Sequence, residues 1–425
     1  MYKKREVILT GFALFAMLFG AGNLIFPPAV GFETGQNWLT AATGFILTGA
    51  GFPLMAIIAA AVAGKDLDSF AVRVSAKFSK VFNIALILAI GPLLALPRTG
   101  ATAFEMIVPQ STENYSVYKF IFLGVFFLIT ILFSLKSSKV IDRVGAILTP
   151  ILLIVLAIII FKGIFSPIGV PSDLHKPETF KYGFLTGYQT MDTLAAIVFS
   201  EIILKSIRKD KALTKKQELS FLLQTSVIAI GGLAIVYGGL VYIGATATDV
   251  VTGGKGNIEL LSSMVILLLG NAGKLILGIC VAGACLTTAI GLTATVGDYF
   301  SKLLNTTYEK VVIITTIISF IFAGFGVDII VKISAPILTL IYPIAIVLII
   351  LNFFKEQIKS NSIYVGAVVG ASLVGAYEMA QVLSINTSEI LTIIYRSLPL
   401  NTFGLAWILP SIICAVSFKY MFKTR

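Results

Sequence analysis

Two glycines and an asparagine interrupt a strongly apolar stretch near the start of the chain. The stretch runs from Phe15 to Pro28, and Gly20, Gly22 and Asn23 lie in its middle. These residues disfavour a continuous helix at that point. In hydrocarbon, each backbone N–H or C=O group that a helix break frees is costly unless protein, water or a ligand satisfies it. The pattern therefore predicts a broken helix that lines a cavity and binds a ligand.

A second polar interruption falls in the apolar run near residue 190. Thr190, Met191 and Asp192 lie here within the sequence Gly-Tyr-Gln-Thr-Met-Asp-Thr. An ionisable residue at membrane depth is expensive and usually functional. Asp192 is therefore a candidate binding residue, and Met191 a candidate apolar wall. The alternative is that this segment is only the water-exposed start of a helix.

Arg98 and Glu105 are the other ionisable pair within an apolar run. They are seven residues apart, close to two helical turns, and so share one face of a helix. We expect either a structural or gating ion pair between them, or an Arg98 that faces Asp192 or the carboxylate of a substrate.

Two adjacent hydroxyl residues, Thr287 and Thr288, follow Ala284 by one helical turn. Threonines in membrane helices usually hydrogen-bond to the carbonyl three or four residues back, which would suffice to explain them. The same arrangement could also offer three oxygen atoms to one hard cation. The spacing alone leaves both interpretations open.

The composition identifies the elements that must position these residues. Hydrophobic residues make up 57% of the 425 residues and charged residues 12%, with a mean hydropathy of +0.97. Such a chain is an integral membrane protein, and its long apolar runs favour helices over a barrel. We predict an all-α fold of about twelve transmembrane helices, near residues 7–31, 37–63, 80–108, 117–134, 144–162, 183–204, 219–244, 272–297, 309–326, 333–353, 362–382 and 400–420. The short apolar segment 257–270 is expected to be a re-entrant or surface helix.

The lysine and arginine residues predict the orientation. An even number of spans places both termini on one side, and the termini and loops of that side hold 23 of the 32 lysine and arginine residues. Basic loops remain in the cytoplasm, so we predict a multi-pass protein of the cytoplasmic membrane with both termini inside. This asymmetry explains the net charge of +11 through contact with membrane lipid, without nucleic acid. The basic N-terminus with its apolar run is expected to be a retained helix, because it lacks a clear signal-peptide cleavage site.

Enzyme chemistry finds little support in the sequence. The three cysteines, Cys280, Cys285 and Cys414, lie in apolar spans without a C-x-x-C pair, so we expect packing residues. The single histidine, His175, lies in a proline-rich loop, where neither a metal site nor a catalytic triad is expected. The loops are too short to hold a catalytic domain, and we predict no enzyme activity.

The whole chain resembles the branched-chain amino acid:cation symporters of the BrnQ type, in the amino acid/polyamine/organocation superfamily. The resemblance rests on GFALFAMLFGAGNLIFPP near the N-terminus, on GPLLALPRTG with Glu105 after it, and on GYQTMDTLAAIVFS, in this order. It implies the leucine-transporter fold, with two inverted repeats of five helices over residues 1–165 and 180–354 and two more helices over 360–425. The first helix of each repeat would be broken, here at Gly20 to Asn23 and at about Thr190 to Ala195.

The resemblance also implies a site. Backbone amides of Gly20, Ala21 and Gly22 would face the substrate carboxylate, with Asn23, Thr190, Met191 and Asp192 nearby. Sodium would be held by the carbonyl groups of Ala16, Phe19 and Ala284 and the hydroxyl groups of Thr287 and Thr288. The implied function is sodium-coupled import of leucine, isoleucine and valine by alternating access, with Na⁺ as the coupling ion and no other cofactor. A proton-coupled symporter that uses Asp192 or Glu105, a carrier for another amino acid, a channel and a membrane enzyme are the alternatives.

Overall fold

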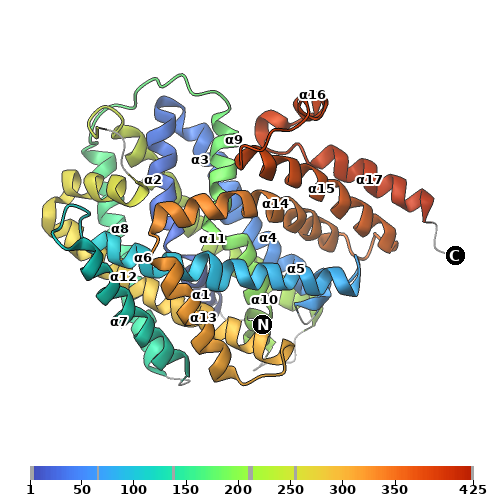
Figure 1. Ribbon diagram of the computed structural model, residues 1–425, viewed down its shortest axis with the longest axis horizontal. Coiled ribbons are helices and arrows are strands. Elements are labelled where there is room, and N and C mark those ends of the chain that lie inside the picture. Colours follow the sequence, from blue (N-terminus) through green and yellow to red (C-terminus); the bar gives the residue numbers. More distant parts are fainter. Residues whose placement is uncertain (1–3, 65–66, 136–138, 209–213, 253–255, 423–425) are drawn as a thin grey trace.

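The computed structural model describes residues 4–64, 67–135, 139–208, 214–252 and 256–422, and all regular structure within them is helical (Figure 1). Seven stretches of these residues are long and apolar enough to cross a membrane, and two shorter apolar helices accompany them. Each of the twelve predicted spans contains helix. The basic loops at 135–143 and 205–216 lie partly outside the described residues.

The first span is broken where the sequence predicts. Helix α1 (Lys4–Leu18) ends two residues before Gly20, and α2 (Gly22–Thr34) begins after Ala21. The next spans are formed by α3 (Trp38–Ile46), a π turn (Leu47–Gly51) and α4 (Phe52–Ala63), by α5 (Ala76–Leu88), a π turn (Ala89–Leu93) and α6 (Ala95–Ile107), and by α7 (Tyr115–Leu135) and α8 (Lys139–Phe165).

A second broken span follows. Helix α9 (Thr179–Gly187) passes into a 3-10 turn (Tyr188–Thr190), Met191 has a left-handed φ of 61°, and α10 (Asp192–Arg208) begins directly after it. The break thus lies at Tyr188–Met191, slightly before the predicted Thr190 to Ala195. Asp192 is the first residue of α10 and is buried. The alternative that this segment is a water-exposed helix start is therefore wrong.

The remaining helices complete the bundle. They are α11 (Lys215–Thr246), α12 (Asn257–Leu303), α13 (Tyr308–Ala323), α14 (Val327–Phe353), α15 (Asn361–Val382), α16 (Glu389–Ser397) and α17 (Ile408–Met421). Helix α12 bends at Gly270, whose φ of 71° is one that glycine adopts without strain. The predicted short helix at 257–270 is therefore the first part of α12. The last span begins at Ile408 rather than near residue 400.

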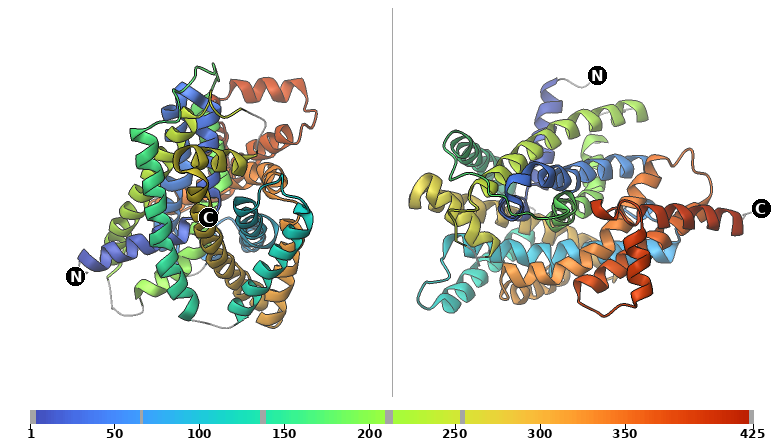
Figure 2. Two further views of the ribbon diagram at one scale, coloured as in Figure 1. Left: turned by 90° about the vertical axis from the view of Figure 1, so that its left-hand side faces the viewer. Right: turned by 90° about the horizontal axis from the view of Figure 1, so that it is seen from above.

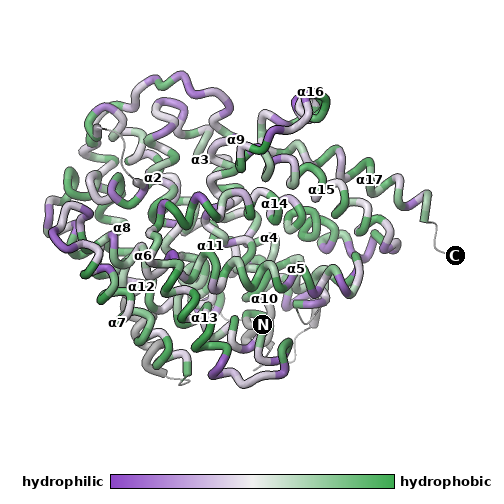
Figure 3. The backbone as a smooth tube through the Cα atoms, viewed as in Figure 1, coloured by the Kyte–Doolittle hydropathy of each residue, from purple (hydrophilic) through white to green (hydrophobic). Residues whose placement is uncertain are grey.

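The two halves of the chain interleave, whereas the last helices lie to one side. In Figure 1 and in both views of Figure 2, the blue to teal helices alternate with green to orange ones. Helix α2 packs on α11, α4 on α10 and α6 on α12, while α15 packs between α14 and α17. Figure 3 shows hydrophobic residues along most of these helices and polar residues in the connections, such as the loop before α9.

Glycines allow the closest of these contacts. A Cβ atom on Gly31 of α2 would lie 1.8 Å from the carbonyl oxygen of Val241, and one on Gly244 of α11 would lie 2.0 Å from that of Pro28. Gly183 of α9 meets Ala41 of α3 in the same way, at 1.9 Å. Small residues let membrane helices approach in the absence of a hydrophobic force between them. These contacts fix the two broken helices against their neighbours.

Candidate functional site

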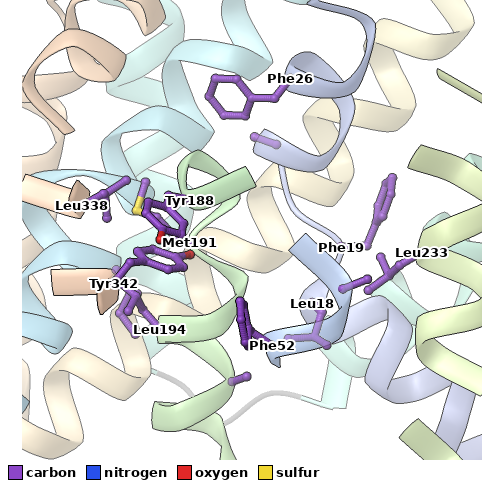
Figure 4. Packing of buried hydrophobic residues seen from close by; sticks show 14 of the residues in the cluster. Leu18, Phe19, Phe26, Phe52, Tyr188, Met191, Leu194, Leu233, Leu338 and Tyr342 are labelled. Atoms are coloured by element: carbon purple, nitrogen blue, oxygen red, sulfur yellow. The ribbon is translucent and has the colours of Figure 1, made fainter. Parts of the chain in front are cut away.

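A small cavity of about 50 Å³ lies between the two helix breaks. Its walls include every predicted substrate-binding residue, namely Gly20, Ala21, Gly22, Asn23, Thr190, Met191 and Asp192. The third side comes from α6 and the turn before it, and the fourth from Thr288 and Leu292 of α12. Figure 4 shows Leu18 and Phe26 on either side of the first break and Tyr188, Met191 and Tyr342 beside the second. The structure therefore brings together residues that are about 170 positions apart in the chain.

Asn23 holds the first break in shape. Its side-chain oxygen accepts a hydrogen bond of 2.9 Å from the backbone N–H of Gly20, and its amide nitrogen donates to the carbonyl of Leu18 at 3.2 Å. The side chain is fully buried. One asparagine thus satisfies a donor and an acceptor that the break removes from the helix.

The same asparagine joins the first break to the second. Its amide nitrogen also lies within hydrogen-bond distance of Oδ2 of Asp192, at 2.7 Å, and of the Tyr237 hydroxyl, so that its two hydrogens are shared among three acceptors. The Tyr237 hydroxyl in turn donates to the same carboxylate oxygen, at 3.0 Å. All three side chains are buried. Three helices, α2, α10 and α11, therefore meet at one polar cluster, which we call the Asn23–Asp192–Tyr237 cluster.

Arg98 lies on the other side of the second break. Its guanidinium donates to the carbonyl of Gln189 at 2.6 Å and to that of Thr190 at 3.5 Å. These are carbonyl groups at the end of a helix, where a positive charge is favourable. The hydroxyl of Ser334 donates to the Gln189 side chain at 2.7 Å, so α14 also supports this turn.

The predicted ion pair between Arg98 and Glu105 is wrong. The partner of the Glu105 carboxylate is not Arg98 but the backbone N–H of Val327, at the first turn of α14, which donates to it at 3.1 Å. A carboxylate at a helix N-terminus is favoured by the helix dipole. Both side chains lie on α6, but each finds a partner on a different helix, which helical spacing alone does not reveal.

The predicted sodium ligands lie on α1, just after α1 and on α12, and only Thr288 among them belongs to the cavity wall. The hydroxyl groups of Thr287 and Thr288 each donate to the Ala284 carbonyl at 2.9 Å, so three oxygen atoms lie close together on α12. Thr288 reaches the cavity wall, together with Met17 and Leu18 of α1. The carbonyl of Ala16 lacks its usual helical donor, because the N–H of Gly20 is bonded to Asn23.

One of the three backbone amides predicted to bind the substrate carboxylate is already hydrogen-bonded within the protein. The Gly20 amide is already used by Asn23, so of the three predicted amides only those of Ala21 and Gly22 remain for a ligand. Phe19 is buried, and its ring stacks on that of Phe15 with 5.2 Å between the ring centroids.

Some residues of the site were not expected. Tyr237 and Ser334 appear in no motif, and both lie within long apolar helices. The available signal was a lone tyrosine in the middle of an apolar span, since a buried tyrosine hydroxyl usually has a partner. Ile90, Thr99, Ala195 and Phe199 complete the mostly apolar wall.

Comparisons with known proteins agree with one another. The model of the family described as branched-chain amino acid transport protein matches residues 3–425. The chain is 40% identical over 422 residues to the branched-chain amino acid permease BraB of Bacillus subtilis, covering 97% of this chain and 94% of that one. It is 35% identical over 415 residues to the branched-chain amino acid transport system 2 carrier protein of Pseudomonas aeruginosa, with 97% and 94% covered.

Solved structures show the same fold. The structure of MhsT in complex with L-phenylalanine matches with a TM-score of 0.57 at 17% identity, covering 99% of this chain and 98% of that one. The inward-facing conformation of Mhp1 matches with a TM-score of 0.63 at 11% identity, covering 98% and 91%. These matches confirm the predicted leucine-transporter fold.

Proposed function

Because the chain belongs to the branched-chain amino acid transport protein family, whose members are transport proteins and not enzymes, we propose that it imports leucine, isoleucine and valine together with sodium. The transport of branched-chain amino acids across a membrane follows from the family. We further propose that sodium is the coupling ion and that the protein lies in the cytoplasmic membrane with both termini on the inner side. The two inverted repeats are also part of the proposal.

The observation that supports this function best is the cavity between the two breaks. Backbone amides at the start of α2 suit the carboxylate of an amino acid. The rest of the wall is largely apolar, with Leu18, Ile90, Met191, Phe199 and Leu292 among its residues. An aliphatic side chain would be buried there and gain about 0.8 kcal/mol per methylene.

Sodium would bind between α1 and α12. Its ligands would be the carbonyl groups of Ala16, Phe19 and Ala284 and the hydroxyl groups of Thr287 and Thr288, all of which are hard oxygen ligands. An ion that joins α1 to α12 would favour the state that binds substrate, so that the two ligands assist each other. One sodium ion that crosses about 100 mV supplies roughly 2.3 kcal/mol, and a tenfold gradient adds about 1.4 kcal/mol. Together these would support an accumulation of several hundredfold.

One observation favours a proton-coupled carrier as the second candidate. The carboxylate of Asp192 is buried, lines the cavity and accepts its hydrogen bonds from neutral groups, Asn23 and Tyr237. A carboxylate in such a place could carry a proton across the membrane.

Uptake of radiolabelled leucine into proteoliposomes tests the proposed function. We expect isoleucine and valine to compete with leucine within about 200-fold of one another, because one methylene discriminates weakly. Alanine lacks three carbons and should compete about 50-fold less well than leucine. Uptake should require sodium at fixed pH. Equal accumulation in potassium-only buffer would contradict sodium coupling, and uptake driven by a pH gradient alone would favour the second candidate.

A further inference from the structure

Two buried side chains of opposite charge line the cavity without forming a direct ion pair. Arg98 and Asp192 are 3% and 4% exposed, and both belong to the cavity wall. The ion pairs found among the described residues lie elsewhere and involve His175, Lys176 and Lys181. A buried charge without an opposite charge is strongly unfavourable. Arg98 and Asp192 attract each other across the cavity, and a ligand with one charge of each sign would pair with both at closer range.

Arg98 has an unused donor beside the first break. Its two terminal nitrogens reach the carbonyl groups of Gln189 and Thr190, but Nε is buried without a hydrogen-bond partner. The guanidinium also lies close to the start of α2, since a Cβ atom on Gly22 would be 2.9 Å from Nη2. The amides of Ala21 and Gly22 and the Arg98 guanidinium thus belong to the same part of the cavity wall, and these groups suit a carboxylate.

Asp192 presents a negative charge to the same cavity. The hydrogen bonds from Asn23 and Tyr237 both go to Oδ2. The Thr190 hydroxyl next to it accepts from the Asp192 backbone N–H at 3.3 Å. The nearest partners of the carboxylate are neutral, so its negative charge is available to an ammonium group.

We propose that Arg98 and Asp192 bind the two charged ends of the amino acid, with Arg98 on the α-carboxylate and Asp192 on the α-ammonium. This inference rests on the proposed function and names the recognition mode of that site. A zwitterion neutralises both buried charges at once. A compound that lacks either charged group leaves one of them unpaired in a site of low dielectric. The pair therefore selects α-amino acids against amines and acids that share their side chain.

The test is competition for radiolabelled leucine binding to the purified full chain. The probes are 3-methylbutylamine, which is leucine without its carboxylate, and 4-methyl-2-oxopentanoate, in which a keto group replaces the ammonium. On the unmodified protein we expect each to compete at least 100-fold less well than leucine. Competition by either compound within tenfold of leucine would overturn the proposal without the use of any variant.

Charge-removing variants test each end separately. Asp192→Asn should lower the affinity for leucine. It should also reduce the preference for leucine over the keto acid to less than tenfold, while the preference for leucine over the amine is kept. Arg98→Gln should show the reverse pattern. Asp192→Glu and Arg98→Lys should restore part of the lost preference, which a purely structural role would not produce. If both preferences remain unchanged in both charge-removing variants, the proposal is wrong.

Two exposed charges outside the cavity provide the control variants. Glu389→Gln and Arg396→Gln remove exposed charges on α16, outside the cavity, and should leave both preferences unchanged. Thermal unfolding of each variant reports whether it is folded. Failure of the unmodified protein to bind leucine would contradict the proposed function itself, whereas normal leucine binding with no charge selectivity would contradict only this inference.

Discussion

Replacing Asn23 by alanine is expected to reduce leucine uptake to less than about 1% of that of the unmodified protein. The side chain is fully buried and lies within hydrogen-bond distance of four polar groups, on Gly20, Leu18, Asp192 and Tyr237. Alanine leaves the Gly20 N–H and the Leu18 C=O unsatisfied, at a cost of about 1–3 kcal/mol each. The first break would then lose its geometry, and with it the site for both ligands. Initial rates in proteoliposomes, corrected for reconstituted protein, measure the effect.

A second buried asparagine provides the matched control. Asn352 is fully buried on α14 and donates to the carbonyl of Phe70 at 2.8 Å, away from the cavity. Asn352→Ala should lower the unfolding temperature but keep the sodium and leucine dependence of the unmodified protein. Asn23→Asp keeps an acceptor for Gly20 but loses the amide donors and adds a charge beside Asp192, so it should also be inactive. A folded Asn23→Ala protein with near-normal uptake would contradict the assigned role.

Replacing Thr287 and Thr288 together by alanine should raise the half-saturating sodium concentration at least tenfold. The double variant removes two of the five proposed oxygen ligands, and a tenfold change corresponds to about 1.4 kcal/mol. Both hydroxyls donate to the Ala284 carbonyl, so their removal leaves no buried donor unpaired, and alanine favours a helix. The protein should therefore fold normally and regain part of its uptake at high sodium. The dependence of leucine uptake on sodium concentration is the measurement.

The same helix offers a control for these hydroxyls. Thr295 on α12 is half-buried like Thr288 and donates to the Gly291 carbonyl at 2.9 Å, in the same way as Thr288 donates to Ala284, but it is not among the residues that line the cavity. Thr295→Ala should leave the sodium dependence unchanged. If the double variant behaves like Thr295→Ala, the two hydroxyls only satisfy the backbone and do not bind sodium.

The sequence predicted the first break well because its residue types are costly in a continuous membrane helix. Gly20, Gly22 and Asn23 act through local conformation, and local conformation can be read from neighbours in the chain. The second break was placed a few residues too late, because it contains no glycine. Met191 has a left-handed conformation and lies beside Tyr188 and Tyr342, and its neighbours in the chain predict neither feature.

Partners across the fold could not be predicted in this way. Arg98 and Glu105 share a helix face, yet their partners come from the 3-10 turn after α9 and from α14, and helical spacing carries no information about either contact. Tyr237 joins the Asn23–Asp192–Tyr237 cluster because α11 packs against α2, which glycines at Gly31 and Gly244 allow. The polar residues were visible in the sequence, but their pairing depends on the arrangement of the helices.

The most direct test of sodium-coupled transport is entry of ²²Na⁺ driven by leucine. Proteoliposomes that contain the chain, with equal sodium and pH on both sides, would receive an inward leucine gradient and trace ²²Na⁺ outside. The account predicts that leucine, isoleucine and valine accelerate ²²Na⁺ entry and that alanine does so much less. Leucine entry with no movement of ²²Na⁺ would contradict sodium coupling and leave Asp192 as the candidate proton carrier.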